Sequence, residues 1–263
     1  MRCMLMALLA FIGHIATNFR VWNRVVDESQ PVPPEEMPLP FSQYNFTSDL
    51  TTDSIGTNHG TTHAITTNKI VVGTSGGIDG NFATLPDPAT QLYDQDGVIT
   101  FPLPLTAKRS LSCWVRINSG AFSCSGELFS QIVAGGSSLA AWAVRLGRSP
   151  TTGTVWLTGV TGGETTGTAV NTITKDVWHH IAVVYDSAAS GQETKLFVDG
   201  SFLTSVPGVQ DTLEGTLNLM GKYRSTDGYQ QLSVPPVSVD TLKVYNVALT
   251  SGQVLTLSQE YTP

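Results

Sequence analysis

The acidic residues of this chain are spaced too widely for a catalytic pair carried on one strand. Retaining glycosidases hold two carboxyl groups about 5 Å apart, a spacing that alternate positions of a strand can provide. The sequence contains no Glu-x-Asp-x-Glu arrangement, and Asp240 has no acidic neighbour two residues away. The glutamates after residue 40 are isolated, mostly near expected turns: Glu127, Glu164, Glu193, Glu214 and Glu260. The sequence therefore predicts no enzyme, unless distant strands bring an acid pair together.

The histidines and glycine pairs give no stronger indication of catalysis or metal binding. His179 and His180 are adjacent on an expected strand, where neighbouring side chains point to opposite faces and cannot bind one ion together. His59 and His63 lie in a Gly/Thr-rich stretch without helical spacing. We interpret all four as structural. The sequence shows no Ser-His-Asp order and no glycine-rich phosphate-binding motif followed by a helix.

The composition indicates a folded chain and argues against one class of partner. Hydrophobic residues make up 41% of the 263 residues, and the 25 glycines suit many turns between short strands. The formal charge of -7, with Lys and Arg spread thinly, argues against nucleic acid as a partner, because binding its backbone requires a basic patch.

Two of the three cysteines, Cys113 and Cys124, leave one disulfide to consider. If residues 111–117 and 127–134 form a hairpin, the two Cα atoms are too far apart for a bond. A pair of free thiols is therefore the favoured alternative, and the redox compartment stays open.

The first 26 residues are predicted to be a hydrophobic leader or anchor helix. Residues 3–16 form an apolar run behind Arg2, as in a secretory signal peptide, and the apolar spacing continues so that one helix can extend over 3–26. Two alternatives stay open: removal on export, or retention as a segment that contacts a membrane or assembly partners. Residues 27–40 carry five of the chain's 14 prolines and are predicted to be an extended acidic spacer.

Short β-rich segments dominate the chain from residue 41 onward, where we predict one domain over 41–263. The segments are 110–117, 154–160, 179–186, 194–200, 215–221 and 237–245. Such strands, separated by Gly, Ser, Thr and Pro, are typical of an antiparallel β-sandwich. Asp199-Gly200 lies between two apolar alternating runs and tolerates the positive φ angles of a type I′ turn, which predicts a β-hairpin.

The order of these motifs resembles a known family. SLSCWVRI, WHHIAVVYD, KLFVDG, LNLMGKY and VDTLKVYNVALTSGQV follow one another as in laminin-G-like domains of the concanavalin A-like lectin/glucanase superfamily. Residues 44–61 are similar to that family's opening strand and its Asp-x-x-Gly-x-x-x-Gly loop. The resemblance implies an all-β, antiparallel jelly-roll β-sandwich of concanavalin A-like type, often with the terminal strands side by side. Residues 62–110 match less well, and irregular loops are expected there.

The same resemblance suggests calcium as a cofactor. Laminin-G-like domains often bind calcium through Asp side chains and backbone carbonyls at one rim, and hard cations prefer oxygen ligands. Asp49, Asp53 and Asp240 occupy the matching positions. The alternative is that these carboxylates accept hydrogen bonds from their own backbone, as Asp in turns commonly does.

Aromatic side chains are the candidates for ligand binding. Large aromatics in sandwiches usually belong to the core, and this is our interpretation of Trp114, Trp142, Trp156, Trp178 and Tyr185. Tyr223, Arg224 and Tyr229 lie in the polar segment KYRSTDGYQQ, which we expect to be a loop. We predict these three as ligand-binding residues at the rim.

These features favour a non-catalytic recognition module that binds a glycan or a protein surface through rim loops. We expect it to be extracellular or surface-exposed, either secreted or tethered to a membrane by its N-terminus. A second hypothesis is a structural component of an assembly, such as a virion surface, decoration or attachment protein, because the surface is rich in Ser, Thr and Gly and poor in Lys. A glycan hydrolase with an unrecognised acid pair is the third. Fold alone does not separate them.

Overall fold

The structure is a computed structural model, and part of the chain is described in it. The described residues are 35–63, 70–85, 98–119, 124–132, 140–148, 152–161, 164–167, 171–188, 193–207, 215–220, 222–224, 229–231 and 236–261. Residues 1–35 and 36–263 form two separate units. The predicted helix over 3–26 and most of the predicted spacer lie outside the described residues. Within the described ranges, no helix is long and apolar enough to cross a membrane.

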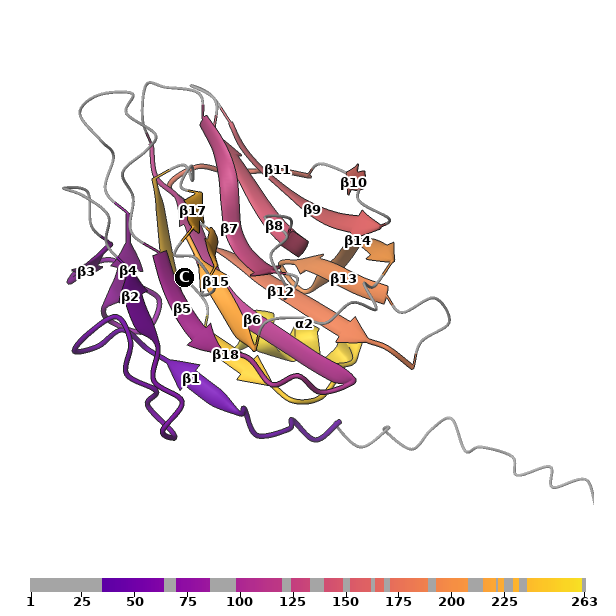
Figure 1. Ribbon diagram of the computed structural model, residues 1–263. Helices are drawn as coiled ribbons and strands as arrows, with labels where there is room; N and C mark the ends of the chain where they lie inside the picture. The colour runs from indigo at the N-terminus through magenta and orange to yellow at the C-terminus, as the bar shows by residue number, and fades with distance from the viewer. Residues whose placement is uncertain are drawn as a thin grey trace, which may run out of the picture. The chain divides into compact units, whose positions relative to one another are not determined.

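Two antiparallel sheets make up the second unit (Figure 1). Sheet A has the spatial order β14 (Ser201–Pro207), β13 (Glu193–Val198), β12 (His179–Asp186), β6 (Lys108–Ile117), β18 (Val237–Tyr245), β4 (Phe82–Thr84) and β3 (Val71–Gly73), and β1 (Ser42–Tyr44) also pairs with β18. Sheet B has the order β10 (Glu164–Gly167), β9 (Gly153–Thr161), β8 (Ala140–Arg148), β7 (Cys124–Ile132), β15 (Thr216–Leu219), β5 (Val98–Pro102) and β2 (Thr61–His63), and β11 (Asn171–Ile173) also pairs with β9. A separate pair consists of β16 (Lys222–Arg224) and β17 (Tyr229–Gln231). The predicted β-sandwich is confirmed.

One hydrophobic core lies between the sheets and explains why these segments form strands. Alternate residues of the central strands contribute to it, among them Leu111, Cys113, Val115 and Ile117 of β6 and Val144, Leu146, Val155 and Leu157 of β8 and β9. Alternation places one side chain in two on the core face of a strand. Burying a large aliphatic side chain stabilises the fold by about 1.5–3 kcal/mol. The sequence runs 179–186 and 237–245 match β12 and β18 residue for residue.

The terminal strands lie side by side, as the family resemblance implied. Ser42 of β1 is opposite Val244 of β18, and the antiparallel register continues to Tyr44 opposite Leu242. The weakly matching region 62–110 contains the short strands β3 and β4 in sheet A and β5 in sheet B.

The hairpin considered between residues 111–117 and 127–134, β6 and β7, does not form. Strand β6 pairs with β12 and β18 in sheet A, whereas β7 pairs with β8 and β15 in sheet B. The chain crosses between the sheets after Ile117 because both strands bury one face in the same core. Cys113 is free and fully buried, and this burial raises the pKa of its thiol well above the ordinary value.

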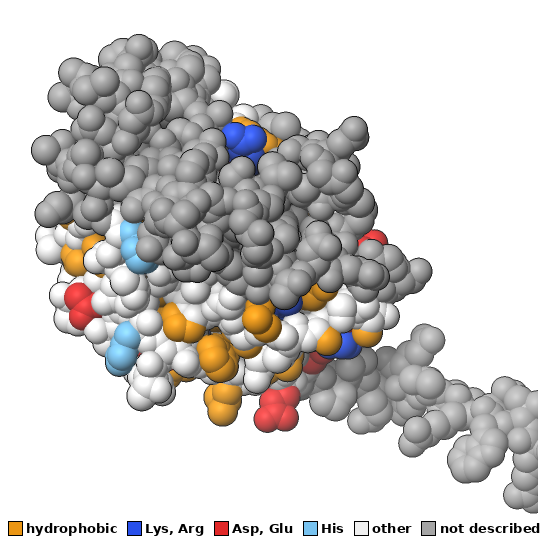
Figure 2. Space-filling model, in the orientation of Figure 1, with side chains coloured by type: hydrophobic (Ala, Val, Ile, Leu, Met, Phe, Trp, Pro, Cys, Tyr) orange, Lys and Arg blue, Asp and Glu red, His pale blue; other side chains and the backbone are white. Residues whose placement is uncertain are grey.

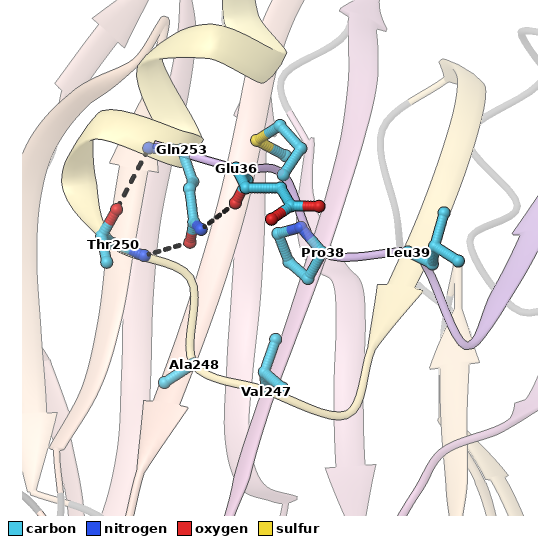
Figure 3. A pocket seen from close by; sticks show the side chains of 8 residues that line it. Glu36, Pro38, Leu39, Val247, Ala248, Thr250 and Gln253 are labelled. Atoms are coloured by element: carbon cyan, nitrogen blue, oxygen red, sulfur yellow. Dashed lines mark hydrogen bonds between the residues drawn. The ribbon is translucent and has the colours of Figure 1, made fainter. Parts of the chain in front are cut away.

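The chain contacts the sandwich from residue 36 onward, which is earlier than the predicted end of the spacer at residue 40. The backbone carbonyl of Glu36 accepts a hydrogen bond from Nε2 of Gln253 at 2.9 Å (Figure 3), and Met37 packs against a buried apolar cluster. The end of the predicted spacer is therefore in contact with the domain from residue 36, rather than free up to residue 40.

Helix α2 (Ser251–Gln259) covers part of the outer face of sheet A, and it lies behind β6 and β12 in Figure 1. Its buried residues Val254 and Leu257 pack with outward-facing residues of the sheet, including Ala182 and Val184 of β12. A capping box begins the helix, because Thr250 and Gln253 exchange side-chain-to-backbone hydrogen bonds. Sheet A is thus buried on both faces near its centre.

Charged side chains are sparse on the described surface, as Figure 2 shows for one face of the molecule. This agrees with a charged fraction of only 13%. Hydrophobic side chains are grouped on the lower part of the described surface in that view.

The predicted Asp199-Gly200 hairpin is confirmed between β13 and β14. Asp199 and Gly200 have φ angles of 49° and 77°, the positive values that a type I′ turn requires. The Asp199 carboxylate also accepts hydrogen bonds from the backbone N–H of His180 at 2.9 Å and from Nδ1 of His179 at 2.8 Å. The turn is therefore fixed to the start of β12.

We expect Gly200→Ala to destabilise the domain by about 2–3 kcal/mol in urea unfolding. An added Cβ would lie 2.5 Å from Oγ of Ser258 and 2.8 Å from Cδ1 of Leu255, and the backbone φ is positive. Gly80→Ala is the matched control, because Gly80 also has a positive φ but no atom within 4 Å of the added Cβ. We expect about 1 kcal/mol for the control. Equal losses for both variants would contradict the predicted clash with α2.

His180 is buried on the outer face of sheet A, beneath the C-terminal segment. Its Nε2 lies 2.7 Å from Oγ of Ser112, its ring contacts Trp114 edge-on, and its Nδ1 has no hydrogen-bond partner among the described residues. Burial lowers the pKa of His180 to about 4; the charge of Lys243 lowers it further and that of Asp199 opposes the change. The protonated ring is therefore strongly disfavoured in the folded state.

Stability should fall as the pH decreases through the range from about 6.5 to 4, because the unfolded chain binds the His180 proton first. At pH 5 this linkage removes about 2 kcal/mol relative to pH 7.5. His180→Gln does not titrate, so its loss of unfolding free energy between these two pH values should be smaller by that amount. An identical pH dependence in both proteins would show that His180 is not the group responsible.

Candidate functional site

Three side chains form a row across neighbouring strands of sheet B. Glu127 of β7 is opposite Arg145 of β8, and Arg145 is opposite Trp156 of β9. The residues next to them along the strands, Leu146 and Val155, point into the core. Because side chains alternate along a strand, the row lies on the outer face of the sheet.

The Trp156 ring lies over the neighbouring strand β8, next to Arg145 and Gly147. The guanidinium carbon of Arg145 lies 5.8 Å from the centroid of that ring. A Cβ on Gly147 would lie 3.0 Å from Cζ3 of Trp156 and 2.5 Å from Oγ1 of Thr154, so the ring covers the backbone at Gly147. Glu127, Arg145 and Trp156 are each partly exposed.

This combination of side chains suits a polyhydroxylated ligand. An indole face stacks on apolar C–H surfaces, a guanidinium donates hydrogen bonds in a fixed plane, and a carboxylate accepts them. The pairing of β7, β8 and β9 holds the three groups at fixed spacing, and Oε2 of Glu127 and Nε of Arg145 are buried within the row.

The predicted ligand residues Tyr223, Arg224 and Tyr229 lie on a hairpin rather than in a loop. Tyr223 and Arg224 belong to β16 and Tyr229 belongs to β17, where Arg224 is opposite Tyr229. The hairpin forms because the segment can pair its own backbone groups, which the polar composition did not reveal. Strand β16 lies beside β5, β7 and β15 of sheet B. The predicted residues therefore lie on a separate two-stranded sheet beside β7, which carries Glu127 of the row.

Trp156 is the functional candidate that the sequence interpretation missed. Trp142, Trp178 and Tyr185 are buried, as expected of core aromatics, but Trp156 is not. The signal was present in the segment TVWLTGV, where Val155 and Leu157 alternate with Trp156 and take the core positions. A strict period of two would have placed Trp156 on the outer face.

Asp49 and Asp53 accept hydrogen bonds from backbone N–H groups of their own loop, and Asp53 also accepts one from β1. Asp49 is exposed and accepts from Thr51 and Thr52; the Thr52 hydroxyl and the Thr51 N–H lower its pKa. Asp53 is buried and accepts from the N–H groups of Gln43, Ile55 and Asn58 at 3.0–3.2 Å.

The two glycines of the Asp-x-x-Gly-x-x-x-Gly loop make room for its neighbours. A Cβ on Gly56 would lie 2.8 Å from Oδ2 of Asp53, and one on Gly60 would lie 2.6 Å from the Phe101 ring. The loop motif therefore has a structural explanation in the anchoring of the residues after β1.

Asp240 is fully buried on β18 and fixes a different loop. Its Oδ2 accepts from the N–H groups of Ile78 at 2.7 Å and Asp79 at 3.1 Å, and its Oδ1 accepts from Thr241 at 2.7 Å. Burial raises the pKa of Asp240 in spite of these hydrogen bonds. Asp240 thus joins residues 76–80 to the central strand of sheet A.

The three predicted calcium ligands do not form one group in the described part of the chain. Asp49 and Asp53 belong to the loop after β1, whereas Asp240 faces residues 78 and 79. No cluster of three or more His, Cys, Asp or Glu suited to a metal occurs among the described residues. His179 and His180 make different contacts, with Asp199 and Ser112. Calcium binding stays a prediction.

A family model matches most of the laminin-G-like domain. A laminin G model described as the concanavalin A-like lectin/glucanase superfamily matches residues 94–255. The chain belongs to this superfamily. The resemblance inferred from the motifs is therefore confirmed for more than half of the laminin-G-like domain.

Solved structures with the same fold include toxin binding domains. The domain is similar to the receptor-binding domain of botulinum neurotoxin type G, with a TM-score of 0.56, 11% identity and coverage of 84% of this chain. It is also similar to the binding domain of botulinum neurotoxin DC in complex with rat synaptotagmin II, with a TM-score of 0.53, 8% identity and the same coverage. The chain spans 51% of each of those two chains, and identities this low show the fold alone. No curated protein sequence matches the chain.

We expect Asp240→Ala to cost the laminin-G-like domain about 2–4 kcal/mol, because three backbone N–H groups lose their acceptor. The measurement is urea unfolding in the presence of a chelator, since this anchoring needs no metal. Asp49→Ala is the control, because its carboxylate is exposed and serves only its own turn. Equal losses for the two variants would contradict the anchor. Calorimetric titration of the wild type with calcium tests the separate calcium prediction, which fails if no heat of binding is detected.

Proposed function

We propose that this laminin-G-like domain is a non-catalytic recognition module that binds glycans on the outer face of sheet B. The observation that carries the proposal is the row of Glu127, Arg145 and Trp156 across three neighbouring strands. The register of the sheet presents a stacking surface, a hydrogen-bond donor and an acceptor together.

The arrangement of the acidic residues favours binding rather than hydrolysis. Cleavage of a glycosidic bond normally requires two carboxyl groups on either side of it, and the row supplies only Glu127. Asp79 lies beside Asp240 at sheet A, but Asp240 is fully buried and occupied by backbone N–H groups. It is therefore out of reach of a polysaccharide.

The hairpin β16–β17 extends the proposed binding surface. Tyr223, Arg224 and Tyr229 are the predicted ligand residues, and β16 adjoins β7, which carries Glu127. An oligosaccharide that stacks on Trp156 would cross β8 and β7 toward this hairpin. We propose that the hairpin residues contact the sugars further from Trp156.

A protein surface is the second candidate ligand. The same fold occurs in a neurotoxin binding domain whose structure contains rat synaptotagmin II, so the sandwich can carry a protein-binding surface. In either case we propose an extracellular or surface-exposed location, with residues 1–26 as leader, membrane tether or contact with assembly partners. If the ligand is a protein surface, a role as a virion surface or decoration protein stays a prediction.

A glycan array screened with the full chain tests the proposal. We expect binding to a limited set of oligosaccharides, and a loss of affinity of about tenfold or more for Trp156→Ala. Phe202→Ala is the matched control, because Phe202 is an aromatic that is 55% exposed on sheet A. We expect the control to bind like the wild type.

The proposal fails if the wild type binds no glycan, or if Trp156→Ala and Phe202→Ala bind alike. Binding to a protein but to no glycan would favour the second candidate. If the hairpin extends the surface, Tyr229→Ala should weaken the binding of longer oligosaccharides more than the binding of monosaccharides.

A further inference from the structure

Gly147 lies in β8, the strand between β7 and β9 in sheet B (Figure 1). Its φ is not positive, so an alanine could adopt the same backbone conformation. A glycine in a strand contributes no side chain to packing and weakens the strand, and it often marks a site where another group approaches the backbone closely. The reason for a glycine at this position must therefore lie in what covers it.

Two side chains of β9 occupy the space above Gly147. A Cβ on this residue would lie 2.5 Å from Oγ1 of Thr154, 3.0 Å from Cζ3 of Trp156 and 3.2 Å from Cη2 of Trp156. Thr154 is directly opposite Gly147, whereas Trp156 is opposite Arg145. Trp156 therefore reaches Gly147 along the diagonal between the two strands, and a methyl group at position 147 would compete with the ring for the same space.

This contact determines how the Trp156 ring is oriented. Cζ3 and Cη2 belong to the end of the indole that is farthest from the Trp156 backbone. Because these end atoms lie over the neighbouring strand, the ring extends along the sheet instead of projecting away from it. The guanidinium carbon of Arg145 is 5.8 Å from the ring centroid, compared with 4.0 Å between Arg109 and the Tyr185 ring. Arg145 is therefore not closely stacked on the indole, and Trp156 remains partly exposed.

We propose that Gly147 is a positioning residue for glycan binding on the outer face of sheet B. The inference rests on the proposed function, because it concerns how Trp156 is presented to the ligand. A sugar stacks with its C–H surface parallel to the indole, so the strength of the contact depends on the orientation of the ring. The missing side chain of Gly147 lets the ring lie over β8, and a larger residue at this position displaces it.

The fold should tolerate a larger residue at position 147. The atoms that an alanine side chain would meet belong to the side chains of Thr154 and Trp156, not to the backbone. Both side chains are partly exposed, so they can move away from the sheet. Gly147→Ala should therefore displace the Trp156 ring and leave the pairing of β8 with its neighbours intact.

Two measurements on Gly147→Ala test the proposal. The difference in near-UV circular dichroism between each protein and the same protein carrying Trp156→Phe isolates Trp156 among the five tryptophans. We expect this difference signal to change in Gly147→Ala. On the glycan array, the affinity for the oligosaccharides that the wild type binds should fall by about threefold to tenfold. Gly215→Ala is the matched control, because its Cβ would lie no closer than 3.8 Å to the atoms around it, and we expect it to resemble the wild type in both measurements.

A double-mutant cycle with Trp156→Ala distinguishes positioning of the ring from a general disturbance of the sheet. If Gly147 acts through the indole, adding Gly147→Ala to Trp156→Ala should change the affinity by less than about twofold. An equal fold-loss from Gly147→Ala in both backgrounds would overturn the proposal, because the effect would then not depend on the ring.

The proposal is also overturned if the Trp156 signal is unchanged in Gly147→Ala, or if the signal changes while glycan binding equals that of the wild type. A wild type that binds no glycan would contradict the proposed function itself, and with it any role of Gly147 in binding. A wild type that binds glycan while Gly147→Ala retains the Trp156 signal and the affinity would contradict the role of Gly147 alone.

Discussion

Strand β18 pairs with β6 along most of its length and with β1 and β4 elsewhere, and all nine of its residues are buried. This pairing connects the first and last strands of the domain to β6 at the centre of sheet A. Near its middle the register shifts between Asp240 and Lys243, and Thr241 has a φ of 47°, a value that β-branched residues rarely adopt. The strain is tolerated because the irregularity directs Asp240 at the backbone of residues 78 and 79, and Lys243 at Glu260.

The burial of sheet A on both sides gives the two faces of the sandwich different roles. Its outer face is covered by α2 and by a second cluster of Phe82, Trp114 and Trp178, so its polar residues serve structure. His180 and Asp240 both lie there. Burial lowers the pKa of His180 and raises that of Asp240, so the uncharged form of each side chain is favoured. Sheet B instead presents Glu127, Arg145 and Trp156 on strands whose other face is in the core. This is why the proposed ligand site lies on the outer face of sheet B rather than on that of sheet A.

Much of the fold was predictable because its strands have a hydrophobic pattern that depends on local spacing alone. Strands β12 and β18 and the Asp199-Gly200 turn were all located from the sequence, since alternation and turn chemistry act over a few residues. The placement of β6 and β7 in different sheets was not predictable in this way. Both strands have the same alternation whether they pair with each other or lie in opposite sheets, so the choice depends on contacts with distant strands.

The same distinction between local spacing and distant contacts applies to the candidate site. The sequence by itself determined the sandwich, its superfamily and the absence of a single-strand acid pair, because these follow from residue order and spacing. Only the tertiary structure decided which side chains meet. Trp156 gains Arg145 and Glu127 as neighbours through the pairing of three strands, and Asp240 gains the backbone of Ile78 from 162 positions away. Such contacts are fixed by sheet register, which a linear pattern of hydrophobic and polar residues does not contain.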